Sequence, residues 1–523
     1  MNAPLPQSPF FLPPPSSENS GVDFLGLRQA NLDMMAELIP GTNNVTSYIR
    51  PFSLLSWIFW KFYGLCEQAA KDRPDSEEMR AFRERIEILF TWGARLEDTP
   101  GIPGKQAEPP SGTDTVPLTF EAWGRVQSST SLIAALWYGP ASKTTTGLGF
   151  LEPVAGGMYR ATQKGTTLAQ ALDGVLRSNN DLYTRLLDTL ATVKATEDDA
   201  RALWSLWGAQ VPTDAERQTF REAVFEAEKI GDYSSLLGRR SGTIALARLH
   251  LSHCARAVVA DDVRRGMFFS GPPSGSPYEV PAELQPALSG WVILQVRQLQ
   301  RLALESLLSW CEARVIGGLR DTADLTREAE KLFRAQSFGV DPDDTLAAII
   351  QKLDARSSPV ESFVSLGRLD ALFSPFALMD DIQVAFKANE ERYAAVGLYG
   401  LLLCGSFAGC FGGNDQRAIN AGGASRLSLY HLRKRLIALG DVSLRQSIQF
   451  ILESMVLSQH FATAVNRFDG QNQRLRLSIE EGGLFSLAGK PWEPTVTEDR
   501  LPTILTLAGD CGLIRKVGNG FQV

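Results

Sequence analysis

Residues 21–65 read GVDFLGLRQANLDMMAELIPGTNNVTSYIRPFSLLSWIFWKFYGL and hold the densest aromatic run of the chain. Pro40-Gly41 interrupts this stretch, which predicts a short helix over 27–38 and a second helix from Tyr48 to Tyr63. The second helix carries apolar side chains at spacings of three and four residues, at Ile49, Phe52, Leu55, Phe59 and Phe62. Further apolar residues fill its other side, so the helix is predicted to be the buried pin of an amino-terminal helical domain or to be clamped by a partner.

The composition is that of a globular protein with several domains. A chain of 523 residues is too long for one hydrophobic core, and 44% hydrophobic with 21% charged residues is ordinary for a folded protein. The net charge of −7 argues against a surface coated in positive charge. The six cysteines form no CxxC pair and the amino terminus has no export signal, which predicts a cytoplasmic protein with free thiols.

The predicted fold class is mainly α, in several domains. We expect a disordered, proline-rich tail over 1–20, an N-terminal helical domain over 21–195, a central helical domain over 196–390, and a C-terminal helical domain over 391–523. Helix starts are indicated by Thr196 with Asp199, by Thr213 with Glu216, and by the run Asp341-Pro342-Asp343-Asp344.

The longest predicted helix runs over 288–315. Its apolar positions predict an inner face, and Arg297, Arg301 and Glu305 are expected mainly on the outside.

Two hairpins next to helices are predicted. A helix over 128–138, a Gly156-Gly157 turn between short strands and a helix through Leu168 resemble the wing of a winged-helix unit over about 120–175, or a plain hairpin between two helices. A helix over 501–513 followed by a hairpin with a Gly-Asn-Gly turn looks like a second winged helix.

The segment 393–413, YAAVGLYGLLLCGSFAGCFGG, is uncharged and long enough to span a bilayer. Six of these residues are glycine, and no polybasic flank is present, so we expect a tightly packed buried helix that ends at Gly412-Gly413. A membrane is therefore not the expected partner.

No catalytic motif is predicted. The four histidines limit acid–base and metal chemistry, and His250, His253 and Cys254 are expected to be helix-surface or core residues rather than zinc ligands. The chain has no phosphate loop, no nucleophile elbow and no Cys with a plausible paired His, and Glu226 to Lys229 matches a nuclease motif only loosely. We predict no catalytic residue, no metal, no cofactor and no small-molecule substrate.

A cationic segment over 417–445 is the candidate binding surface, because it holds six Lys or Arg residues against one acid, Asp441. These cations, with two more on the terminal hairpin, are predicted to contact nucleic-acid phosphates, and the alternative is a solvated helix face. The candidate residues are Arg417, Arg426, Arg433, Lys434, Arg435, Arg445, Arg515 and Lys516.

Three motifs carry a resemblance to a group of known proteins: Phe24-Leu25-Gly26-Leu27-Arg28, Leu38-Ile39-Pro40-Gly41-Thr42, and Asn44-Val45-Thr46 with the aromatic run and Arg50 after it. They resemble the start of large prokaryotic proteins encoded in antiphage defence islands beside helicases, ATPases or nucleases. In those proteins the region is a helical module of unassigned chemistry, and the resemblance extends loosely to 156–168. It supplies no catalytic residues.

The resemblance implies an accessory, non-enzymatic subunit of a multi-gene antiphage or anti-plasmid defence system, which binds DNA, a partner helicase, ATPase or nuclease, or both. The alternative is a defence effector with a cryptic nuclease site or a membrane-active helix at 393–413.

Overall fold

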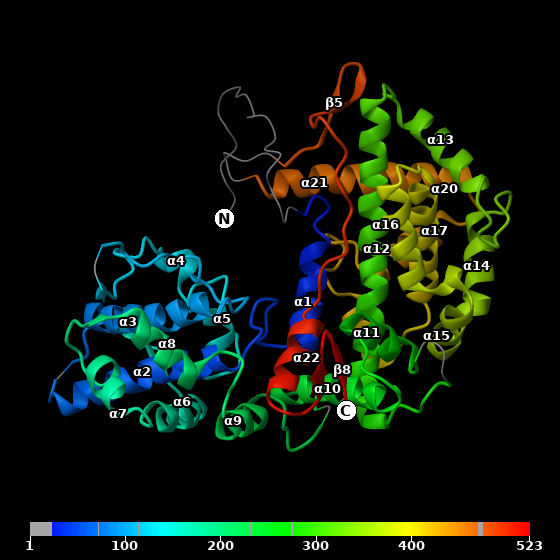
Figure 1. Ribbon diagram of the computed structural model, residues 1–523. Helices are drawn as coiled ribbons and strands as arrows, with labels where there is room; N and C mark the ends of the chain where they lie inside the picture. Colours follow the sequence, from blue (N-terminus) through cyan, green and yellow to red (C-terminus); the bar gives the residue numbers. More distant parts are fainter. Residues whose placement is uncertain (1–22, 72, 113, 231, 273–275, 469–473) are drawn as a thin grey trace. The chain divides into compact units, whose positions relative to one another are not determined.

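The computed structural model describes residues 23–71, 73–112, 114–230, 232–272, 276–468 and 474–523. These residues are mainly α-helical, as predicted, and their strands form small two-stranded antiparallel sheets (Figure 1). The predicted tail over 1–20 lies outside the described residues.

The chain divides into two compact units, each built from three stretches of sequence. Unit 1 takes its residues from Met1–Met35, Phe268–Pro277 and Leu288–Glu498, and unit 2 takes its residues from Ala36–Met267, Tyr278–Ala287 and Asp499–Val523. Three of the five divisions fall within helices, namely α1 (Arg28–Leu38), α11 (Ala260–Phe269) and α12 (Gln285–Ile316). Each predicted domain is one continuous stretch of sequence, whereas each unit combines three stretches. The predicted domain boundaries remain predictions.

Unit 2 is organised around α2 (Arg50–Gln68), the aromatic helix of residues 21–65. Figure 1 shows α2 among α3 (Ser76–Leu96), α6 (Gln163–Leu176) and α8 (Glu197–Trp207). Phe52, Trp57 and Phe62 of α2 are 0% exposed, which confirms the prediction of a buried helix. A helix that is apolar on every side is stabilised when neighbouring helices cover all of its sides, because this removes most of its apolar surface from water.

Both cationic side chains of α2 are buried with acidic partners. Arg50 forms an ion pair of 3.0 Å with Glu216, and both side chains are 0% exposed. Lys61 pairs with Asp188. A buried charge needs a partner of opposite charge. The two acids therefore allow a cationic side chain to stay buried at each of these helix positions.

The rest of unit 2 consists of short elements and helices. In chain order they are β1 (Val116–Pro117), α4 (Gln127–Thr130), α5 (Tyr138–Ser142), β2 (Leu151–Pro153), β3 (Tyr159–Ala161), α7 (Asn180–Leu182), β4 (Lys194–Ala195), α9 (Asp214–Val224), α10 (Leu236–Ser252), α22 (Leu501–Asp510), β7 (Arg515–Val517) and β8 (Gly520–Gln522). The sheet pairs are β1 with β4, β2 with β3, and β7 with β8, all antiparallel.

The predicted single helix over 128–138 is wrong, because α4 ends before Ser131 and α5 begins only at Tyr138. The carboxylate of Glu87 accepts hydrogen bonds from the Ser131 hydroxyl at 2.8 Å and from the Leu132 N–H at 2.9 Å. A buried acceptor on another helix thus takes the N–H that would continue α4.

The predicted helix starts are confirmed at two of three places. Thr196 with Asp199 and Thr213 with Glu216 both form complete capping boxes. The prediction at 341–344 is wrong by a few residues, since α14 (Leu346–Ser357) begins after the N-cap Thr345. The Asp341 carboxylate instead accepts the N–H of Asp343, which makes a local turn.

Unit 1 is mainly helical and includes most of α12. Its other elements are α13 (Thr322–Arg334), α14, α15 (Val360–Leu369), α16 (Pro375–Lys387), α17 (Arg392–Phe407), α18 (Gln416–Ile419), α19 (Leu429–Leu439), α20 (Leu444–Phe450), a π-helical turn over Ile451–Leu457, α21 (Ser458–Asn466), β5 (Leu477–Glu480) and β6 (Gly483–Ser486). Strands β5 and β6 pair as a hairpin.

Glycines explain how α17 packs. A Cβ atom at Gly397 would lie 2.5 Å from the Ser306 hydroxyl of α12, and one at Gly405 would lie 2.4 Å from a methyl of Leu436 on α19. All residues of α17 except Arg392 are buried, which confirms the prediction of a tightly packed buried helix, but the predicted end at Gly412-Gly413 is wrong because α17 ends at Phe407. Among the described residues, no helix is long and apolar enough to cross a membrane.

The predicted outward orientation of the charged residues of α12 is wrong. Arg297, Arg301 and Glu305 are 1%, 5% and 2% exposed. Arg297 donates to the carbonyl oxygen of Leu427 at 2.6 Å, and Gln298 donates to that of Thr497 at 2.6 Å. Irregular chain covers this face of α12, and its buried carbonyl groups need donors that only polar side chains supply.

Both predicted hairpins are present, at β2–β3 and at β7–β8. The turn of the second uses Gly518, whose φ of +58° lies in the left-handed region that glycine adopts readily. A winged-helix identity for either hairpin remains a prediction.

Candidate nucleic-acid interface

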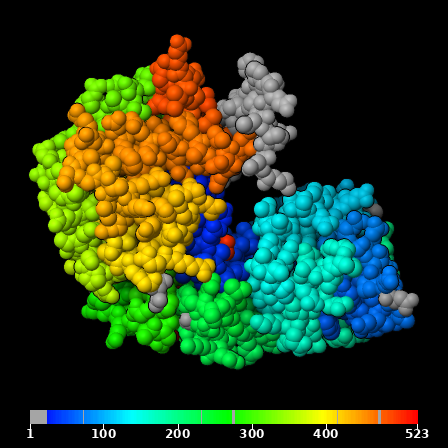
Figure 2. Space-filling model, turned by 180° about the vertical axis from the view of Figure 1, so that it is seen from behind, coloured from blue at the N-terminus to red at the C-terminus, as the bar shows by residue number. Residues whose placement is uncertain are grey.

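The eight predicted cations fall into two groups that belong to different units. Arg417, Arg426, Arg433, Lys434, Arg435 and Arg445 lie on or between α18, α19 and α20 of unit 1, and Arg515 and Lys516 lie on β7 of unit 2. Figure 2 shows the golden-yellow part of the chain that contains α18 and α19 on the face turned to the viewer. The two groups of cations therefore have separate surroundings.

Arg433 is part of the internal structure of unit 1. Its guanidinium donates to both carboxylate oxygens of Asp354, at 2.9 and 3.1 Å, and to the carbonyl oxygens of Gly405 and Ser406 at the end of α17. Gly409 leaves room for this group, because a Cβ there would lie 2.3 Å from the guanidinium carbon. The side chain thus satisfies helix-terminal carbonyls that have no partner within α17.

We expect Arg433→Met to lower the free energy of unfolding of unit 1 by about 2 kcal/mol. The charged hydrogen bonds are lost, and the value is discounted because the two side chains are 25% and 31% exposed. Urea denaturation followed by circular dichroism measures the change. Arg327→Met, which removes an exposed cation from α13, is the matched control, and equal midpoints for the two variants would contradict the structural role.

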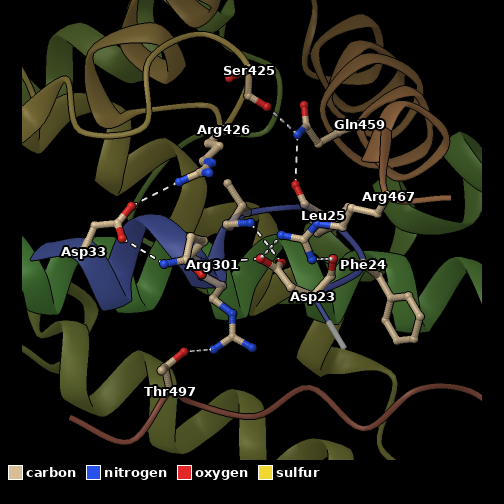
Figure 3. Close-up of polar contacts among 12 residues, drawn as sticks. Asp23, Phe24, Leu25, Asp33, Arg301, Ser425, Arg426, Gln459, Arg467 and Thr497 are labelled. Atoms are coloured by element: carbon tan, nitrogen blue, oxygen red, sulfur yellow. Dashed lines mark hydrogen bonds and ion pairs between the residues drawn. The ribbon is translucent and has the colours of Figure 1, made fainter. Parts of the chain in front are cut away.

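Arg426 and Arg445 are also ion-paired inside unit 1. Arg426 pairs with Asp33 of α1 at 3.1 Å, and Arg445 pairs with Glu330 of α13 at 2.5 Å. Figure 3 shows the Arg426 contact beside a second link, in which the Gln459 amide donates to the carbonyl oxygens of Ser425 and Leu25. The contacts of Arg426 and Ser425 fix the irregular chain before α19, whereas the Arg445 pair joins α20 to α13.

The start of the described chain is held by the same network, which sequence reasoning missed. Arg467 donates to the backbone oxygen of Asp23 at 2.8 Å and to its carboxylate at 3.2 Å (Figure 3). The Asp23 carboxylate also accepts the N–H of Leu27, just before α1. The motif at 24–28 therefore serves as an anchor of unit 1, and the acid at Asp23 was the only signal for it in the sequence.

His460 completes this anchor as a neutral residue. Its Nδ1 bonds the Phe24 carbonyl oxygen at 3.2 Å, so Nδ1 carries the proton, and Nε2 accepts the N–H of Arg476 at 3.0 Å. Burial lowers the pKa of His460 to about 4, since the charged imidazolium is disfavoured away from water. The arrangement suits a structural bridge rather than an acid or base at neutral pH.

A buried carboxyl group with a raised pKa lies on α12. Glu305 accepts from Arg301 at 2.9 Å, and Arg301 also donates to the Thr497 hydroxyl (Figure 3). Burial raises the pKa of Glu305 to about 7, against the lowering effect of Arg301, and its Oε2 has no hydrogen-bond partner among the described residues. The i,i+4 Arg–Glu spacing within an apolar helix was the sequence signal for this pair.

Lys434, Arg435 and Arg417 remain as the surface cations of the unit 1 group. Lys434 and Arg417 are exposed and Arg435 is half-buried. Within the described parts of the chain, Lys434 and Arg435 have no ion pair. Lys434 shares a face of α19 with two further exposed side chains, Tyr430 at 43% and Ile437 at 55%.

Arg515 and Lys516 are exposed on the edge strand β7 of the terminal hairpin. No carboxylate among the described residues lies within ion-pair distance of either cation. Both are therefore available to an anionic partner.

The histidine and cysteine cluster of unit 2 forms a contact that sequence reasoning did not find. Cys254 Sγ lies 3.4 Å from His250 Nε2, whereas the ring of His253 stacks on Tyr278 at 4.7 Å. Burial lowers the pKa of His250 to about 4, with a smaller effect of His253, and burial raises the pKa of Cys254. Both shifts favour the neutral pair, opposite to the thiolate of a catalytic cysteine.

Among the described residues, no group of three or more His, Cys, Asp or Glu side chains is placed to hold a metal ion. Comparisons of the chain with protein-family models, with curated proteins and with solved structures found no match.

Proposed function

We propose that this chain is a non-enzymatic subunit of a multi-gene prokaryotic antiphage or anti-plasmid defence system, and that it binds DNA and a partner helicase, ATPase or nuclease. The resemblance of residues 21–65 supports the defence role, and the surface cations support the DNA role. The proposal places DNA contacts on α19 of unit 1.

The exposed face of α19 is the observation that carries the DNA contact. Lys434 supplies a cation that has no ion pair in the part of the chain that the structure describes, Arg435 lies next to it, and Tyr430 and Ile437 flank Lys434 at helical spacing. Lysine and arginine bind phosphates, and an exposed aromatic ring beside them packs on sugars or bases. Arg433 is excluded from the contact set because it is committed to Asp354.

The double reversal Lys434→Glu with Arg435→Glu tests this contact. We expect duplex DNA affinity at about 50 mM salt to fall at least tenfold, and the slope of log affinity against log salt to become shallower by about 2. Fluorescence anisotropy with a labelled duplex measures both quantities.

The matched control is Arg327→Glu with Lys331→Glu on α13, which changes the net charge equally at two exposed, locally paired cations. The control is expected to bind as the unmodified chain does. Equal losses in the two double variants would show a general charge effect and would count against a contact on α19.

A further inference from the structure

Two stretches of unit 2 that are far apart in sequence come together around the terminal hairpin. Val258, which lies between α10 and α11, donates to the Phe521 carbonyl oxygen of β8 at 3.0 Å, and the Phe521 N–H donates to the Val258 oxygen at 2.8 Å. Strand β8 pairs on its other edge with β7. Val258 thus adds a single-residue bridge to the hairpin, and the order is Val258, β8, β7, with both pairings antiparallel.

Helices complete a recognisable topology. Helix α10 precedes the bridge at Val258 and α11 follows it, while α22 precedes β7 and packs against it. Helix α10 packs against both α22 and β8. A winged helix has the order helix, strand, helix, helix, strand, strand, with the last strand in the middle of its sheet, and here the bridge at Val258 takes the place of the first strand. Here residues 268–498 are inserted between its second and third helices.

Two contacts join residues 236–267 to residues 499–523. Arg264 of α11 forms a two-pronged ion pair with Asp499, at 2.5 and 2.7 Å, and the same carboxylate accepts the N–H of Leu501 at the start of α22. The Asp499 side chain is 2% exposed. Gly520 allows the close approach of the strands, since a Cβ there would lie 3.2 Å from both the Ala257 Cβ and the Val258 oxygen.

The assembled piece is strongly basic within an acidic chain. Residues 236–267 and 499–523 contain nine Lys or Arg and four Asp, a net charge of +5, whereas the whole chain carries −7. Four of the cations are exposed and have no carboxylate within ion-pair distance among the described residues. These are Arg248, Arg256, Arg515 and Lys516. A local excess of this size attracts a polyanion.

The third helix of this arrangement, α22, carries few side chains that could recognise DNA bases. Its one charged residue, Asp510, is an acid, and the Pro502 side chain at its surface carries no hydrogen-bonding group. Base recognition in the major groove needs side chains such as Arg, Asn or Gln on the inserted helix. Contacts from this piece are therefore expected to involve the phosphate backbone.

We infer that residues 236–267 and 499–523 form one winged-helix module, split by a long insertion, whose wing at Arg515 and Lys516 binds duplex DNA through phosphates without sequence preference. This inference deepens the proposed DNA-binding function and rests on it. The module lies entirely within unit 2.

The double variant Arg515→Glu with Lys516→Glu in the full chain tests the DNA contact. We expect its affinity for two duplexes of equal length and unrelated sequence to fall at least tenfold at about 50 mM salt, with a salt slope shallower by about 2. The unmodified chain should bind both duplexes equally. The α13 control, Arg327→Glu with Lys331→Glu, should keep full affinity.

Unchanged binding by the wing variant would overturn the inference, as would a preference of the unmodified chain for one duplex. If the wing variant binds normally while Lys434→Glu with Arg435→Glu loses affinity, the proposed function stands and this inference fails. If the unmodified chain binds neither duplex, the DNA part of the proposed function fails together with the wing contact.

Hydrogen exchange tests the split module independently of DNA. Gly520→Val should push the segment at Val258 away from β8, because the added side chain meets Ala257 and the Val258 oxygen. We expect faster amide exchange at both 256–259 and 515–522. Faster exchange confined to 515–522 would overturn the assignment of the two stretches to one module.

Discussion

Arg50→Met is expected to lower the free energy of unfolding of unit 2 by about 3–5 kcal/mol. Arg50 and Glu216 are both fully buried at 3.0 Å. The arginine also donates to the carbonyl oxygens of Leu206 and Val211, at 3.0 and 2.7 Å. Its removal leaves one buried carboxylate and two carbonyl groups without their strongest donor.

The double variant Arg50→Met with Glu216→Gln separates charge from packing. Because it removes both charges, it should recover part of the stability, and the difference is measured from urea denaturation midpoints. Asp214→Asn, on the exposed first turn of α9, serves as a control of little effect. A loss below about 1 kcal/mol for Arg50→Met would contradict the central role of this pair in unit 2.

Glu312→Gln is expected to lower the free energy of unfolding of unit 1 by about 3 kcal/mol. Glu312 of α12 is 0% exposed and pairs with Arg476, and its second oxygen accepts the N–H of Trp492 at 2.7 Å. Arg476 in turn lies over the ring of Phe24 at 5.2 Å. The carboxylate thus holds a chain of contacts that ends in the anchor at 24–28.

Two measurements check this prediction. Urea denaturation gives the loss of stability, and hydrogen exchange should show faster exchange at 23–27 and at 476–492. Glu328→Gln, on the exposed face of α13, should change neither quantity. Loss of stability without faster exchange at 23–27 would show that Glu312 does not act through Arg476.

The helices and their starts could be predicted from sequence where local chemistry decides them. The threonines at 196 and 213 with an acid three residues later cap α8 and α9 by contacts within four residues. The glycine-rich α17 was also foreseen as a buried helix, because small residues permit close packing whichever helix is the neighbour.

The polar faces could not be predicted, since their partners are distant in sequence. Arg433 and Lys434 are neighbours with similar local surroundings, yet Arg433 meets Asp354, 79 residues away, and Lys434 faces outward. A turn of about 100° around the helix separates the two side chains. The burial of Arg297 is likewise not predictable from local sequence, because its acceptors, the carbonyl oxygens of Arg426 and Leu427, are 129 and 130 residues away.

The interleaving of the two units has a consequence for synthesis on the ribosome. Unit 2 cannot close after residue 267, because Asp499 and Phe521, the partners of Arg264 and Val258, come only after the whole of 268–498. At about 5–20 residues per second this delay lasts roughly 10–50 s. During that interval the part of α10 that packs against α22 and β8 in the folded chain is still open to water, so we expect a chaperone to bind the nascent chain there.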